Sequence, residues 1–217
     1  MPPRQRQRFP LSDFSTPQTA EIALEAIGTI YRIAASRETR SGLTLDRLGG
    51  FLLAEMENSD TLLIVWHSRT GTARAMADAA MEEAGTTARL LRAEETQPGD
   101  LLDAGGYLFI CPENLASMTG MMKEMFDRCY YPVLGRLEGR PFATAIAAGS
   151  DGEGAQRQMD RIAKGWRLKR VAEPLIVNTD AQTPKEILAE KTVCNEELTP
   201  CRDLGAALAE GLRQGVF

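Results

Sequence analysis

Residues 61–74, which read TLLIVWHSRTGTAR, constrain the fold more than any other stretch of this chain. Residues 62–66 are apolar without alternation, as in a strand that is buried on both faces of a parallel sheet. A turn rich in small and hydroxyl-bearing residues follows, and the sequence after it predicts a helix that ends near Gly85. Backbone N–H groups and the helix dipole make such a strand–turn–helix unit a site for anions. We therefore expect a phosphate group to bind at this turn.

The rest of the region from residue 61 to residue 217 alternates between strand and helix patterns. Further strands are predicted over 86–93, 106–112, 141–149 and 170–178, the last of them containing Pro174, and further helices over 118–130, 154–166 and 198–214. Buried strands with helices between them favour an open α/β sheet that is doubly wound, with helices on both faces.

The ligand of such a sheet binds beyond the carboxyl ends of the strands. The loops that follow the first, third and fourth predicted strands are 67–72, 112–118 and 149–154, and all are rich in small or turn-forming residues. Each loop alone could be a plain connection, but together they favour a binding site at one edge of the sheet. We expect the glycines of the third loop to let the main chain approach a flat ring. The motifs GxxxxGK[ST] and GxGxxG are absent, which argues against a Walker-type nucleotide site and a dinucleotide-type Rossmann site.

Residues 1–60 form a separate N-terminal region without strand-like runs. Apolar residues recur at helical spacing over 17–34, and a shorter helical pattern follows over 44–52. An apolar stripe of this length must be covered, either by the main domain or by a second subunit. We predict an N-terminal helical extension over 1–60, a main domain over 61–217, and a homodimer.

Composition and charge exclude several classes of function. No apolar run approaches the roughly 18 residues of a membrane span, and the net charge of −5 argues against a dedicated nucleic-acid binder. The basic start of the chain is not followed by the apolar segment of a secretory signal, so a cytoplasmic location is expected. The four cysteines form no CxxC pair and His67 is the only histidine, so no metal site is predicted.

The three loops resemble segments of the flavodoxin-like FMN-binding superfamily, over roughly residues 61–215. The sequence SRTGTA at 68–73 matches the pattern [ST]-x-T-G-x-T in all but its last position. The sequence PENLASMTGMMKEMFDR at 112–128 is similar to a segment of the flavodoxin-like NAD(P)H:quinone oxidoreductases, although Ala116 replaces the usual glycine and Leu115 a frequent aromatic residue. The third loop resembles the glycine-rich segment beside the flavin pyrimidine. The N-terminal extension has no counterpart in this resemblance.

The resemblance implies a five-stranded parallel sheet of order 2-1-3-4-5 and FMN as the cofactor, with NAD(P)H as a possible electron donor. The first loop would hold the phosphate, and the other two would sandwich the isoalloxazine ring, where a carboxylate at Glu113 would disfavour negative charge on the ring. No catalytic side chain is assigned, because the flavin itself transfers the electrons. The cofactor-binding residues implied are Ser68, Arg69, Thr70, Gly71, Thr72, Ala73, Pro112, Glu113, Asn114, Leu115, Ala116, Met118, Gly149, Ser150, Asp151, Gly152 and Gly154.

Three functions agree with these features. The first is an FMN-dependent oxidoreductase that passes electrons from NAD(P)H to a quinone-like or other small acceptor, which the absence of Trp and Tyr from the two ring-side loops favours. The second is a flavodoxin-type electron carrier that docks on a redox partner protein, and the third is a flavodoxin-like protein that has lost FMN. Fold alone does not decide between them.

Overall fold

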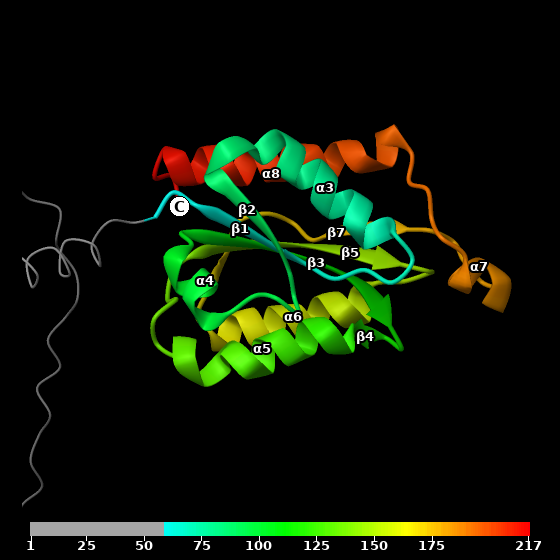
Figure 1. The fold of residues 1–217 in the computed structure, drawn as a ribbon, viewed down its shortest axis with the longest axis horizontal. Helices are drawn as coiled ribbons and strands as arrows, with labels where there is room; N and C mark the ends of the chain where they lie inside the picture. The colour runs from blue at the N-terminus through cyan, green and yellow to red at the C-terminus, as the bar shows by residue number, and fades with distance from the viewer. Residues whose placement is uncertain (1–58) are drawn as a thin grey trace, which may run out of the picture. The chain divides into compact units, whose positions relative to one another are not determined.

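The computed structural model describes residues 59–217 as an α/β domain built on a parallel sheet (Figure 1). The strand order is β2-β1-β3-β5, followed by β6 and β7, which both pair with β5 in parallel. These strands span Leu62–Trp66 (β1), Ala88–Arg92 (β2), Gly106–Asn114 (β3), Pro141–Ala148 (β5), Lys169–Arg170 (β6) and Leu175–Asn178 (β7). The predicted doubly wound order 2-1-3-4-5 is confirmed, with β6 and β7 together in the place of the fifth strand.

The fifth strand is interrupted, where the sequence predicted one strand over 170–178. The first part, β6, pairs with the start of β5 and β7 with its end, while 171–174 belong to neither. Pro174 immediately precedes β7 and has no backbone N–H to donate to a neighbouring strand. The chain therefore leaves the sheet edge and rejoins it after the proline.

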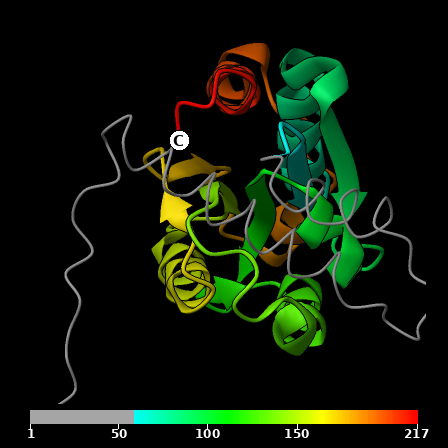
Figure 2. The ribbon, with the colours of Figure 1, turned by 90° about the vertical axis from the view of Figure 1, so that its left-hand side faces the viewer.

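Helices cover both faces of the sheet, as the sequence predicted. Figures 1 and 2 show α3 and α8 on one face and α5 and α6 on the other. Two short helices, α4 and α7, and a 3₁₀ turn were not predicted. The helical elements span Thr72–Ala84 (α3), Gly85–Thr87 (3₁₀), Pro98–Asp103 (α4), Gly120–Val133 (α5), Glu153–Gly165 (α6), Pro184–Leu188 (α7) and Asn195–Arg213 (α8).

The core lies in two layers, because alternate residues of the central strands point to opposite faces. Leu63 and Val65 pack towards α5 and α6, whereas Leu62 and Ile64 pack towards α3 and α8. All four are fully buried, which explains why β1 reads as a continuous apolar run rather than an alternating one. Burial on both faces agrees with the position of β1 in the centre of the sheet. The turn that follows β1 lies at the carboxyl end of the strands.

The predicted helices over 17–34 and 44–52 lie outside the described residues. The division near residue 60 and the homodimer therefore stay predictions. Within residues 59–217, no helix combines the length and the hydropathy that crossing a membrane requires.

Candidate functional site

A cavity of about 700 Å³ lies at the carboxyl edge of the sheet. The loops after β1, β3 and β5 all line it, as the sequence predicted. Figure 1 shows the same edge with α7 beyond it. The predicted site residues that line the cavity are Ser68, Arg69, Thr70, Thr72, Ala73, Pro112, Glu113, Asn114, Leu115, Ala116, Gly149 and Ser150.

The turn after β1 leaves an open helix N-terminus in the cavity. Gly71 has φ of +104°, a conformation that favours glycine, and its N–H donates to Ser68 Oγ at 3.1 Å. The first intrahelical bond comes from Ala75 N to Gly71 O. Within residues 59–217 the amides of residues 72–74 have no partner, and no acidic side chain occupies the first turn of α3. This end of α3 is therefore available to an anion.

The loop after β3 is a tight hairpin with a protruding tip. Its return strand is β4 (Ser117–Met118), which pairs antiparallel with the end of β3. Leu115 and Ala116 have φ of +52° and +54°, as in the two-residue turns that suit a β-hairpin. Leu115 is fully exposed at the tip, whereas Met118 is buried in the core and does not line the cavity. Of these two predicted ring contacts, only Leu115 faces the cavity.

Glu113 joins the second loop to the third. Its carboxylate accepts hydrogen bonds from Gly152 N at 2.8 Å and from Ala155 N at 3.1 Å, at the N-terminus of α6. The negative charge that the sequence suggested would face a ring is thus directed at helix amides, which stabilise it. Because a carboxylate already occupies this end of α6, the N-terminus of α3 remains as the open anion site of the cavity.

Two glycines of the third loop serve packing rather than access to a ring. A Cβ on Gly154 would lie 2.3 Å from Ala116 O, and one on Gly152 would lie 2.7 Å from Ile176 Cγ2. Only a glycine lets the start of α6 approach the second loop this closely. The predicted residues outside the cavity lining are Gly71, Met118, Asp151, Gly152 and Gly154.

A fourth wall of the cavity comes from the segment between β7 and α8, which the sequence analysis missed. A Thr-Pro-Lys-Glu sequence at 183–186 begins α7, with a capping box and a proline in the first turn. That pattern could have revealed the helix, but not its place beside the cavity. The lining residues that were not predicted are Ala147, Ala148, Thr179, Ala181, Ile187, Leu188 and Lys191.

His67 lies next to this site, but its side chain packs inside the domain. It is 7% exposed, does not line the cavity, and its Nδ1 lies 3.1 Å from Glu94 Oε1. Burial raises the pKa of Glu94, but hydrogen bonds from its own amide and from Arg92 bring that pKa below its ordinary value overall. Within residues 59–217, no three His, Cys, Asp or Glu side chains gather as metal ligands would.

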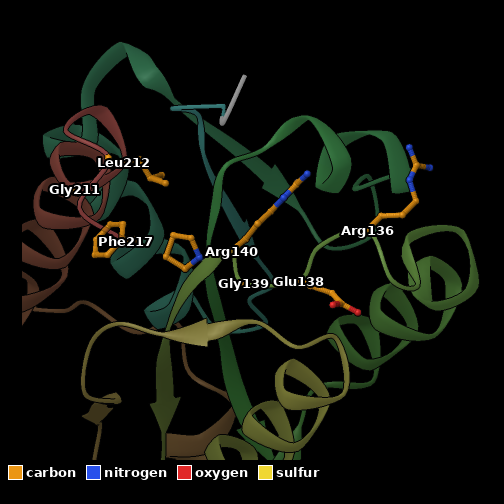
Figure 3. Close-up of a pocket in the computed structure, with 9 residues that line it drawn as sticks. Arg136, Glu138, Gly139, Arg140, Gly211, Leu212 and Phe217 are labelled. Atoms are coloured by element: carbon orange, nitrogen blue, oxygen red, sulfur yellow. The ribbon is translucent and has the colours of Figure 1, made fainter. Parts of the chain in front are cut away.

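A second cavity, of about 370 Å³, lies at the opposite end of the sheet, where β5 begins (Figure 3). Its most prominent cation is Arg140, but Nη1 of that side chain donates to the carbonyls of Leu102 and Ala104 at 2.8 and 2.6 Å. These bonds cap the end of α4. The Arg140 side chain is therefore already engaged within the protein.

Comparison with known proteins agrees with the fold. A family model described as "NADPH-dependent FMN reductase" matches residues 99–175. A flavodoxin of Aquifex aeolicus is 28% identical over 159 residues, which cover 69% of this chain and 85% of that protein.

Two solved structures have the same fold. A WrbA-like flavodoxin from Agrobacterium tumefaciens has a TM-score of 0.58 at 18% identity, covering 71% of this chain and 98% of the other. A flavodoxin from the domain Archaea has a TM-score of 0.57 at 16% identity, covering 70% and 99%. With the strand order and the three loops, these similarities show a flavodoxin-like fold and support the resemblance to the flavodoxin-like FMN-binding superfamily. The comparisons support FMN as its cofactor.

Proposed function

We propose that this protein is an FMN-dependent oxidoreductase that passes electrons from NAD(P)H to a quinone-like or other small acceptor. The observation that carries the proposal is the cavity itself, which combines an open helix N-terminus with exposed apolar side chains at its rim. Its volume of about 700 Å³ is in the upper part of the range of roughly 300–1,000 Å³ that is usual for ligand sites. The match to the reductase family model supports the same function.

The residues present fit the phosphate of FMN. The free amides of residues 72–74 would donate to it, together with the hydroxyls of Ser68, Thr70 and Thr72, all of which line the cavity. Ser68 Oγ already accepts from Gly71, which leaves its own proton available for donation. Arg69 also lines the cavity and belongs to none of the ion pairs within residues 59–217, so its charge can add to the attraction.

The second and third loops would contact the flavin ring. Neither contains Trp or Tyr, and Leu115 stands at the exposed tip, which leaves space for a substrate beside the ring. When bound, FMN supplies the transfer of two electrons, so that NAD(P)H, a proton and a quinone give NAD(P)⁺ and a hydroquinone. Residues of this chain bind and orient both molecules, and no side chain is required as a general acid or base.

A one-electron carrier that docks on a redox partner protein is the second candidate. The similarity to the flavodoxin of Aquifex aeolicus favours it, and the net charge of −5 agrees with docking on a basic partner. For the oxidoreductase, we also propose NAD(P)H as the electron donor, a cytoplasmic location and a homodimer.

Steady-state kinetics of the purified full chain test the proposal. The protein should show flavin absorption bands near ~370 and ~450 nm, and it should oxidise NADPH or NADH in the presence of menadione. Free FMN at the same concentration is the control. A yellow protein without turnover would favour the carrier, and a colourless protein that takes up no FMN would identify a domain that has lost its cofactor.

A further inference from the structure

Three large apolar side chains gather around the main cavity although solvent reaches them. Leu115 is 101% exposed, Ile187 52% and Leu188 79%, and all three line the cavity. Leaving such surface in water costs about 25 cal/mol per Å² of apolar area. Single exposed apolar residues are ordinary, but a group of them around one cavity indicates a binding surface for an apolar molecule.

The segment that carries Ile187 and Leu188 is anchored at both ends. At its start, Thr179 N and Oγ1 donate to Ala148 O at 2.9 and 3.1 Å. At its end, Lys191 N donates to Thr70 O at 2.7 Å. Both acceptors belong to residues that themselves line the cavity. These hydrogen bonds tie both ends of the segment that contains α7 to the rim of the cavity.

The wall presents hydrocarbon to the cavity and little charge. The ammonium group of Lys191 is directed at the carbonyl end of α7, where it donates to Ala189 O at 2.7 Å and also to Glu186 O. The opposite walls present backbone amides and hydroxyls, which suit a phosphate and the polar edge of a ring. An apolar wall without donors of its own suits the face of a flat ring instead.

We propose that Ile187 and Leu188 form the acceptor wall of the site, against which an apolar, ring-shaped electron acceptor packs beside the flavin. This inference rests on the proposed function and adds the residues that determine which acceptors are used. The wall favours uncharged aromatic acceptors over small charged ones, because only the former cover the exposed side chains of α7.

The test compares two acceptors in the full FMN-loaded chain, with NADPH as the donor. The variant is Ile187→Ser combined with Leu188→Ser, and the matched control is Leu134→Ser, which alters a 50% exposed leucine outside the cavity lining. The probes are menadione, which is flat and apolar, and ferricyanide, which is small and highly charged. We expect KM for menadione to rise roughly tenfold or more in the double variant, with less than a twofold change for ferricyanide and for FMN content.

Several results would overturn the acceptor wall. An unchanged KM for menadione, or an equal loss with both acceptors, would mean that α7 does not contact the acceptor. Loss of FMN from the double variant would place α7 on the cofactor instead. If the wild type turned over neither acceptor, the proposed enzymatic function would fail. Equilibrium binding of menadione to the FMN-loaded protein would then test the acceptor wall separately from turnover. Weaker binding to the double variant than to the wild type would support the wall, and no binding to the wild type would refute it.

Discussion

Replacing Glu113 with glutamine should destabilise the domain, because this carboxylate ties the second loop of the site to the start of α6. The side chain accepts from Gly152 N at 2.8 Å and from Ala155 N at 3.1 Å. Glutamine keeps one acceptor oxygen and turns an NH₂ group towards the other amide. One charge-assisted hydrogen bond, about 1.5–3 kcal/mol, is therefore lost, together with about 0.3–1 kcal/mol of charge–dipole interaction.

We take the lower end, about 2 kcal/mol, because Glu113 is only partly buried and water can replace part of the loss. For a domain of this size, that corresponds to a fall in Tm of roughly 4–8 °C. Chemical and thermal denaturation of the full chain, followed by circular dichroism, measure it. Glu153→Gln is the matched control, since Glu153 lies in the first turn of the same helix and pairs only with the exposed Arg157. Its expected cost is below about 1 kcal/mol. Equal stability of the Glu113 variant and the wild type would refute the bridging role.

Two further perturbations test the packing and the charges around the site. Gly205→Ala should destabilise the domain by about 1–3 kcal/mol or more, because its Cβ would lie 2.1 Å from the backbone oxygen of Ala80 on α3. The control is Gly165→Ala, whose Cβ would meet no other atom within 4 Å, and it should be neutral or slightly stabilising. Urea titration measures the free energy of unfolding of both variants. Glu94→Gln should lower the stability at pH 7, because the folded state holds the pKa of Glu94 below its ordinary value. A carboxyl with a lowered folded-state pKa stabilises at higher pH and loses that contribution as the pH falls, so the gap between wild type and variant should close below the ordinary glutamate pKa. A gap that widens in acid would contradict this sign.

The sequence predicted the central sheet because its signals are local. Residues 62–66 and 106–112 are apolar without alternation, and all of them except Trp66 and Pro112 are buried. The break in the fifth strand was missed because a proline can occur in an edge strand where its missing N–H faces away from the sheet. Only the observed pairing with β5 shows which residues of 170–178 lie outside the sheet.

The loops around the cavity were also predicted from local signals in the sequence. Loops at the carboxyl edge follow from topology, and the cavity brings three of them together. The direction of the Glu113 side chain and the packing of Gly154 against Ala116 depend on contacts between segments far apart in the sequence. No local pattern reveals such contacts, and the position of Ile187 and Leu188 beside the cavity is hidden in the same way.

The comparison of FMN with riboflavin as ligands of the cofactor-free protein tests the phosphate site at the start of α3. The two differ only in the phosphate, which we expect to bind at the open N-terminus of α3. A phosphate held by several charge-assisted hydrogen bonds predicts a Kd for FMN about 100-fold or more below that for riboflavin, at roughly 1.5–3 kcal/mol for each bond. Equal affinities, or no binding of either flavin, would contradict a phosphate site at residues 68–73.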